Sequence, residues 1–168
     1  MFQEVSLRLW QSTDAQRLCE LGNNPNIAAN MRDAFPSPYT LTDALGFINK
    51  TIEDEHFKHV RAIVWNEEVV GSIGIFQEHD IYRFNYEIGY WLGEAYWGKG
   101  IMKEALRLMI NYAETETDAH RLYAGVFDYN VASANVLRRN GFKEVALLQD
   151  KVFKNGRFIH EYLFEILI

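Results

Sequence analysis

The chain has 168 residues, 48% of them hydrophobic, and its 17 basic and 23 acidic side chains give a net charge of −6. This composition excludes intrinsic disorder, and Cys19 as the one cysteine excludes a disulfide framework and a cysteine-based zinc cluster. No basic cluster is long enough to follow a nucleic-acid backbone and no apolar run approaches the ~18 residues of a membrane span, so we expect a single cytoplasmic domain over residues 1–168 without nucleic-acid or membrane partners.

The N-terminal part predicts a strand, a helix and an ordered loop. Alternating residues indicate a strand over 5–10. Thr13 and Gln16 fit a capping box for a helix that runs to about Leu21 and stops at the Gly-Asn-Asn-Pro sequence of residues 22–25. Two prolines and several aromatics over 30–40 then indicate a loop.

The next segment predicts a second helix followed by a β-hairpin. Thr40 and Asp43 form a capping box for this helix. Its apolar face would consist of Ala44, Phe47, Ile48 and Ile52. The β-rich runs 61–65 and 69–76 are separated by three polar residues, 66–68, which is typical of a hairpin.

A fourth strand is predicted over residues 82–92. Its two faces would carry Phe84, Tyr86, Ile88 and Tyr90 on one side, and Asn85, Glu87, Gly89 and Trp91 on the other. A helix with an apolar stripe starts near Gly100, a strand follows over 122–127, and a short helix over 130–140 ends at Gly141. Asn155-Gly156 predicts a tight turn between two last strands. The order of these elements favours a mixed α/β (α+β) sandwich with a mostly antiparallel central sheet flanked by helices.

The loop between the fourth strand and the following helix carries a Gly98-Lys99-Gly100 sequence. Two glycines there let a backbone approach a ligand, and the helix start offers unpaired N–H groups to a phosphate. Gly93-x4-Gly98-Lys99 also approaches the P-loop pattern of nucleotide-binding proteins. Gly100, however, stands where that pattern needs a hydroxyl residue for Mg²⁺, and the preceding hairpins do not fit a parallel sheet.

Several short sequences, in order and spacing, resemble one enzyme superfamily. They are Asn23-Asn24-Pro25, Glu87-Ile88-Gly89-Tyr90-Trp91-Leu92, Tyr96-Trp97-Gly98-Lys99-Gly100, Glu104-Ala105 and Asn130-x2-Ser133-x2-Val136-Leu137-x3-Gly141-Phe142. Together they resemble the GNAT superfamily of acetyl-CoA-dependent N-acetyltransferases, especially the branch of ribosomal-protein N-terminal acetyltransferases (RimJ/RimL-like), over nearly the whole chain. The resemblance implies a GNAT-like acyl-CoA N-acyltransferase fold, acetyl-CoA as co-substrate and no metal.

The resemblance also implies a cofactor site. Its residues would be Trp91, Leu92, Gly93, Gly98, Lys99, Gly100, Ile101, Met102 and Asn130. The pyrophosphate would lie on the glycine loop, and the pantetheine arm along the end of the preceding strand and against Asn130. Ala95 departs from the family pattern, which has Gln or Arg there, so one side-chain contact is lost. A plain strand-to-helix turn at the glycines and an N-cap role for Asn130 remain alternatives.

Chemistry requires that the acceptor amine lose a proton and the departing thiolate gain one. Glu87 is the candidate base, with a surface carboxylate or an ion pair as the alternative. The family's usual tyrosine acid is replaced by Leu137, which leaves Ser133 as the candidate acid, or as a simple first-turn helix residue. Reserve candidates for the acid are Tyr90, Tyr123 and Tyr129. Family geometry implies a backbone N–H near Leu92 for the carbonyl oxygen.

The acceptor site is the least defined part. By resemblance, Met31, Arg32, Phe35 and Tyr39 would line it, although the same residues could simply pack a core. A protein N-terminus and a small-molecule amine both stay open as acceptor. So does a second class of function, a non-catalytic acyl-CoA sensor on the same fold. The aromatic-rich last strands could pair with another copy as a homodimer, and the five histidines show no metal-ligand spacing.

Overall fold

The computed structural model describes residues 4–168, which contain seven strands and five α-helices. The strands are β1 (Val5–Arg8), β2 (Val60–Trp65), β3 (Glu68–Gln77), β4 (Asn85–Leu92), β5 (Arg121–Phe127), β6 (Lys143–Lys154) and β7 (Arg157–Leu167). The α-helices are α1 (Ala15–Gly22), α2 (Pro25–Ala28), α3 (Leu41–Glu53), α4 (Ile101–Glu116) and α5 (Val131–Arg139).

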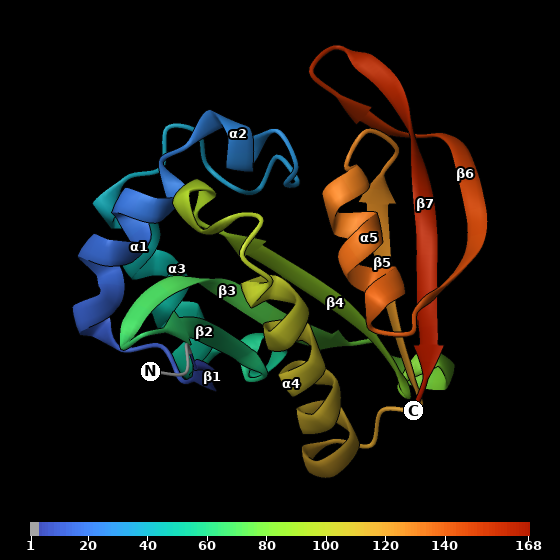
Figure 1. The fold of residues 1–168 in the computed structure, drawn as a ribbon, viewed down its shortest axis with the longest axis horizontal. Coiled ribbons are helices and arrows are strands. Elements are labelled where there is room, and N and C mark those ends of the chain that lie inside the picture. The colour runs from blue at the N-terminus through green and yellow to red at the C-terminus, as the bar shows by residue number, and fades with distance from the viewer. Residues whose placement is uncertain (1–3) are drawn as a thin grey trace.

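All seven strands form one sheet in the order β1-β2-β3-β4-β5-β7-β6. Every neighbouring pair is antiparallel except β4 and β5, which are parallel. This parallel pair requires the crossover that α4 supplies, as Figure 1 shows. The mixed α/β, mostly antiparallel fold class expected from the sequence is therefore confirmed.

Helices cover both faces of the sheet, so the molecule has two apolar cores. On one face, α4 and α5 pack on β3, β4, β5 and β7, with Leu106, Met109, Leu122 and Phe164 fully buried. On the other face, α1 and α3 pack on β2, β3 and the Trp91 side chain of β4. The central strand β3 is accordingly buried on both sides, which explains its continuous apolar run.

Most local predictions from the sequence hold. Thr40 and Asp43 form the predicted capping box of α3, with the Thr40 N–H donating to the Asp43 carboxylate at 2.8 Å. The β2–β3 hairpin turns at Asn66 and Glu67, which both have positive φ, and the β6–β7 hairpin turns likewise at Asn155 and Gly156. Positive φ at both central residues is typical of the two-residue turns that match strand twist.

Two predicted boundaries are wrong. Asp14, and not the Thr13–Gln16 pair, anchors the first helix: its carboxylate accepts from the Gln11 N–H at 2.9 Å and from two Arg8 nitrogens at 2.7 and 2.9 Å. This contact ties the helix start to β1, so a 3-10 turn precedes α1. The strand predicted from residue 82 begins only at Asn85, since positive φ at Asp80 and a 3-10 turn at 80–82 reverse the chain there.

Two further details differ from the prediction. Ile52 is 63% exposed, because the last turn of α3 extends beyond the core that buries Ala44 and Ile48. The short helix α2 was not predicted. Asn24 caps it by accepting from the Asn26 N–H, and Pro25 occupies its first position.

Residues 4–168 contain neither a helix suited to cross a membrane nor a cluster of metal-binding side chains. None of their helices combines the length and the apolar run that crossing a membrane requires. Nor do three or more His, Cys, Asp or Glu side chains of these residues gather in a group able to hold a metal ion.

Candidate active site

A wedge-shaped opening separates the outer halves of β4 and β5. The two strands pair only at Asn85–Arg121, Tyr86–Leu122 and Glu87–Tyr123. Beyond Glu87 they diverge, as Figure 1 shows, and β4 continues with β3 while β5 continues with β7. The β4 edge that faces β5 therefore offers unpaired main-chain groups to a ligand.

The direction of these main-chain groups follows from one hydrogen bond. The Gly93 N–H donates to the Val70 carbonyl of β3 at 2.8 Å. Because successive strand residues point their N–H groups to opposite sides, the Leu92 N–H points away from β3, toward the opening. The Leu92 carbonyl, on the same side, accepts from the Trp97 indole N–H at 2.8 Å. This bond fixes the glycine loop against the strand end.

The glycine loop ends where α4 begins. Gly98 has φ +73° and Gly100, the N-cap of α4, has φ +79°. No atom lies within 4 Å of the position a Cβ would occupy at either glycine. Backbone conformation, and not crowding within the protein, therefore requires glycine there. The first amides of the 16-residue α4 point out of the helix start beside this loop.

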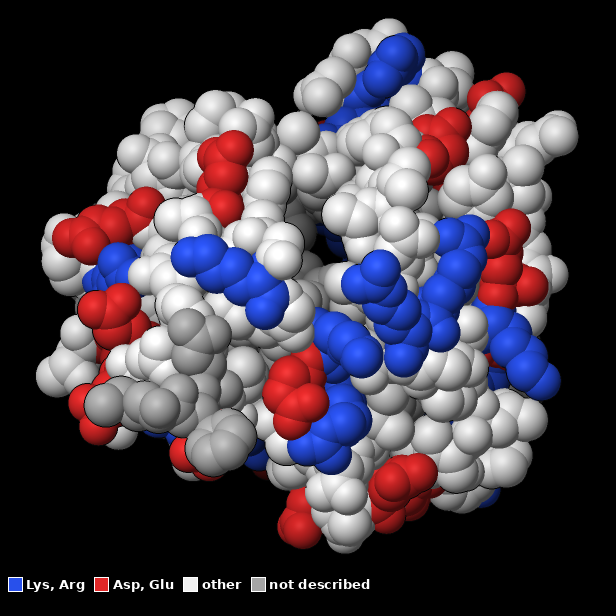
Figure 2. All heavy atoms as spheres, viewed as in Figure 1, with Lys and Arg blue, Asp and Glu red and all other residues white. Residues whose placement is uncertain are grey.

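Basic side chains gather around this helix start although the whole chain is acidic. Figure 2 shows Lys and Arg groups over α4 and α5, on either side of a hollow in the surface. The sequence supplies Lys103 and Arg107 on α4, and Arg138 and Arg139 on α5. Lys99, in the loop itself, lies with its Nζ 5.3 Å from the Trp65 ring centroid and 5.5 Å from that of Tyr96. Arg107 and Arg138 pair with Glu104 and Glu144, and the remaining positive charge favours a negatively charged ligand.

Across the opening, Asn130 caps α5, since its Oδ1 accepts from the Ser133 N–H at 3.2 Å. The Ser133 hydroxyl lies 2.9 Å from the Tyr90 hydroxyl of β4. Burial raises the pKa of Tyr90 to about 12, against a smaller lowering by the Ser133 hydrogen bond. Tyr90 is therefore a protonated donor at neutral pH. The Ser133–Tyr90 pair bridges the two sides of the opening on the α5 face of the sheet.

Glu87 lies on the opposite face and forms an ion pair with Arg32 from the loop after α2. The Glu87 side chain is 26% exposed, whereas that of Arg32 is 74% exposed. The ion pair given above as the alternative for Glu87 is thus present. Its basic partner, Arg32, is a long side chain that lies mostly on the surface. Because the Arg32 side chain is mostly exposed, it can move away from Glu87 into solvent.

The other predicted acceptor residues contribute mainly packing. Phe35 contacts both Tyr39 and Trp91, at ring-centroid distances of 4.9 and 5.7 Å. Tyr39 is buried, and burial raises its pKa, with Asp43 and Cys19 adding to the effect. Met31 packs at the edge of the same core. The loop over 30–40 is therefore an ordered cover over the Glu87 face.

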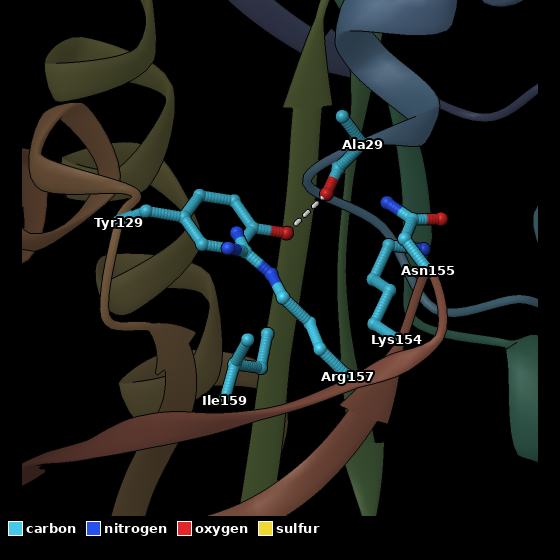
Figure 3. Close-up of a pocket in the computed structure, with 6 residues that line it drawn as sticks. All are labelled: Ala29, Tyr129, Lys154, Asn155, Arg157 and Ile159. Carbon is cyan, nitrogen blue, oxygen red and sulfur yellow. Dashed lines mark hydrogen bonds between the residues drawn. The ribbon is translucent and has the colours of Figure 1, made fainter.

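A pocket of about 200 Å³ lies between this cover and the C-terminal hairpin. Figure 3 shows its lining residues: Ala29, Tyr129, Lys154, Asn155, Arg157 and Ile159. The Tyr129 hydroxyl donates to the Ala29 carbonyl at 2.5 Å, and the buried Lys154 ammonium pairs with Asp33 at 2.9 Å. These two contacts join segments 100 and 121 residues apart and frame the entrance of this pocket.

The sequence predicts site residues on both sides of the β4–β5 wedge. It does not predict that the β6–β7 hairpin lines the pocket. Lys154 and Arg157 flank the predicted turn, and only the pairing of β6 with β7 and the strand order bring them near Ala29. No local pattern in the sequence encodes that long-range pairing. The turn residues Asn155-Gly156 were the one available signal.

These features fit the shape of coenzyme A. An open glycine cradle with helix N–H groups suits its pyrophosphate, and the unpaired edge of β4 suits its peptide-like pantetheine arm. The basic residues over α4 and α5 suit its remaining phosphate. The residues present therefore fit the phosphate and pantetheine parts of an acyl-CoA.

Comparison with known proteins agrees with this geometry. The family model described as "Acetyltransferase (GNAT) domain" matches residues 4–143. An uncharacterized N-acetyltransferase, p20, of Bacillus licheniformis is 30% identical over 98% of the chain and 93% of its own length. The spermidine N(1)-acetyltransferase of Vibrio cholerae is 25% identical over 94% of the chain and 90% of its own length.

Among solved structures, the ribosomal L7/L12 alpha-N-protein acetyltransferase RimL in complex with coenzyme A has a TM-score of 0.84. It is 22% identical, and the match covers 98% of this chain and 93% of that one. At this identity the similarity establishes the fold, and the resemblance in the site rests on the residues described above.

Proposed function

Because the chain belongs to the acetyltransferase (GNAT) domain family, whose members transfer acetyl groups from acetyl-CoA to amines, we propose that it acetylates a primary amine in the wedge between β4 and β5. The single observation that carries this proposal is the divergence of the two strands beside the N-terminus of α4. It supports an acyl-CoA cradle next to the end of the strand that carries the Glu87 carboxylate.

In this proposal acetyl-CoA is held mostly by main-chain groups. The amides from Gly98 to Met102 bind the pyrophosphate, assisted by Lys99. Pantetheine lies along Trp91, Leu92 and Gly93 and reaches Asn130, whose Nδ2 is not engaged by the helix cap. The Leu92 N–H points toward the opening and binds the thioester oxygen, on which negative charge develops during attack.

Glu87 then acts as the general base. The amine nitrogen forms a bond to the acetyl carbon, its proton passes to the Glu87 carboxylate directly or through water, and the C–S bond breaks. Arg32 orients the Glu87 carboxylate in the free enzyme and moves aside for a cationic acceptor.

The departing thiolate takes a proton from the Ser133–Tyr90 pair. The two hydroxyls are within hydrogen-bond distance of each other, so a proton lost from one is replaced from the other. Since a thiol has a pKa near ~8.5, this protonation contributes modestly to the rate.

The acceptor enters, in this proposal, through the pocket between Ala29 and the C-terminal hairpin, and passes the loop carrying Met31, Arg32, Phe35 and Tyr39. Relatives named for a ribosomal-protein N-terminus and for spermidine define the range of amines to test. A protein α-amine and a small-molecule amine are therefore both included as acceptors in the test.

Release of free thiol from acetyl-CoA in the presence of an amine panel tests the proposal. The panel contains spermidine and peptides that begin with alanine or serine. We expect amine-dependent thiol release with at least one acceptor, and a mass increase of one acetyl group in that acceptor. Tight coenzyme A binding without thiol release from any amine would contradict the proposal and favour a non-catalytic sensor.

A further inference from the structure

A second carboxylate, that of Glu161 on β7, lies near the opening and has no role in the mechanism above. Its side chain is only 11% exposed. Its one ion-pair partner in the described residues is Lys151, whose ammonium nitrogen lies 2.6 Å from a Glu161 carboxylate oxygen. The Lys151 side chain is 52% exposed. A buried acid paired with an exposed, flexible base is an ion pair that another ammonium group can replace.

The neighbouring strand makes room for this carboxylate. A Cβ at Gly125 of β5 would lie 2.6 Å from the Glu161 carboxyl carbon and from one of its oxygens. Any side chain at residue 125 would therefore displace the Glu161 carboxylate. Glycine at this position lets the carboxylate lie over β5 itself.

Strand register places this point at the edge of the wedge. The last β4–β5 pair is Glu87 with Tyr123, and Gly125 lies two residues farther along β5, on the same face. On β4, Gly89 likewise lies two residues after Glu87, on the same face. Both strands thus lack a side chain just where they separate, and the Glu161 carboxylate borders the space that this leaves.

The same strand face leads outward to the pocket. Every second residue of β7 lies on the same face, and this face carries Arg157, Ile159 and Glu161. Arg157 and Ile159 line the pocket shown in Figure 3. Glu161 therefore lies on the inner side of the entrance, between the pocket and the wedge.

We propose that Glu161 is a specificity-determining residue that binds an ammonium group of the acceptor, in the position now held by the Lys151 ammonium. This inference rests on the proposed acceptor path. It assigns the acceptor to the class of alkylamines that carry a positive charge at neutral pH. Lys151 is the internal stand-in for that group and leaves the carboxylate when the acceptor binds.

The test compares Glu161→Gln, Lys151→Gln and the control Glu165→Gln. Glu165 lies four residues along on the same strand and face, and it also forms an ion pair, with Arg121 at 2.5 Å, but it is at the closed end of the wedge. The best acceptor of the amine panel serves as substrate, and spermidine binding to the coenzyme A complex is titrated in parallel.

Glu161→Gln should raise KM and weaken spermidine binding roughly tenfold to a hundredfold, as expected for loss of a charged hydrogen-bond partner, with kcat changing much less. Lys151→Gln should lower KM, because the carboxylate is then free for the acceptor. Glu165→Gln should change neither. A purely structural ion pair would instead make both members of the pair affect stability and leave KM unchanged.

Three results would overturn the inference: equal KM values for Glu161→Gln and the control, a fall in kcat alone, or a rise in KM for Lys151→Gln. If Glu161→Gln does not fold, the direction of the Lys151→Gln effect decides. Failure of the wild-type protein to acetylate any amine is a separate result, since it contradicts the proposed function and leaves spermidine binding to test Glu161.

Discussion

Single residues divide the chemistry between the two faces of β4. Glu87 and Trp91 face the N-terminal helices, whereas Tyr90 faces α5 and contacts Ser133. The strand alternation therefore places the proposed base for the amine on one side of the sheet and the proposed acid for the thiol on the other. In the proposed complex the thioester would lie between them at the level of the sheet, where the strands separate.

Replacement of Glu87 by Gln tests the base directly. We expect kcat to fall by about 10²–10⁴, the usual contribution of general base catalysis, because the amine then loses its proton only to water. The loss should shrink as pH rises, since more of the amine is already neutral. Initial rates between neutral and alkaline pH measure this.

Glu78, whose carboxylate accepts from the Tyr123 hydroxyl, provides a matched control for Glu87. Glu78→Gln removes a carboxylate next to Tyr123, at the paired end of β4 and β5, and leaves Glu87 in place. Equal pH–rate profiles for wild type and Glu87→Gln would remove Glu87 from the mechanism.

Replacement of Ser133 by Ala should lower kcat by about tenfold, less than the usual range for acid catalysis, because the thiol is itself a good leaving group and Tyr90 remains. Comparing thioesters with different leaving thiols shows whether the fall in kcat comes from lost protonation of the thiolate. With a more acidic thioester the difference between Ser133→Ala and wild type should disappear, and a loss that persists would mean that Ser133 only supports the α5 N-terminus.

Sequence spacing could locate residues on a strand face but not their partners. Glu87, Trp91 and Tyr90 occupy the faces that alternation predicts. The contacts of Glu87 with Arg32, and of Ser133 with Tyr90, join residues 55 and 43 positions apart. Such contacts depend on strand order and helix packing, which a single sequence does not encode locally.

At the level of elements, the glycine loop and α4 form the part of the site best determined by local sequence. The positive φ of Gly98 and Gly100 and the helix start at Ile101 follow from the residue types present. The start of β4 was misjudged by three residues, because the aromatic residues before it resemble a strand while Asp80 reverses the chain. Local chemistry thus predicts turns well when glycine marks them.

Gly100→Ala should lower the free energy of unfolding by about 1–2 kcal/mol, since a left-handed conformation is unfavourable for a residue with a Cβ. It should also weaken coenzyme A binding, because the new methyl group projects into the cradle. Chemical unfolding and calorimetric titration measure the two effects.

Gly46→Ala is the matched control for Gly100→Ala. Gly46 lies within α3, with nothing within 4 Å of a new Cβ and no positive φ. The change should stabilise the protein by about 0.8–1 kcal/mol, the difference in helix propensity, and leave coenzyme A affinity unchanged. If the free energy of unfolding falls in Gly100→Ala and rises in Gly46→Ala, backbone strain at Gly100 is separated from the general effect of replacing a flexible glycine. A change in the same direction for both variants would contradict our account of the loop.

On the scale of the whole molecule, titration links stability to pH. His59 directly precedes β2, and its Nδ1 lies 2.9 Å from the Tyr112 hydroxyl, which itself accepts from Arg61 at 2.8 Å. Burial, assisted by Lys58 and Arg61, lowers the pKa of His59. The folded protein therefore favours neutral His59, and the unfolded chain binds the proton more readily.

The free energy of unfolding should accordingly be constant above about pH 6.5, the ordinary pKa of histidine, and decrease as the pH falls below it. His59→Gln should flatten this decrease, while the same change at the exposed His56 should not. We propose that residues 1–168 unfold in one cooperative transition, which the same denaturation curves test. An unchanged slope in His59→Gln would show that another group is responsible.

The most direct test of the central claim is a crystal structure of the protein with acetyl-CoA. We predict that the diphosphate accepts hydrogen bonds from the amides between Gly98 and Met102, and that the thioester lies in the wedge with its oxygen toward the Leu92 N–H. A cofactor bound away from the β4–β5 wedge, or a wedge that stays empty at saturating acetyl-CoA, would contradict the account.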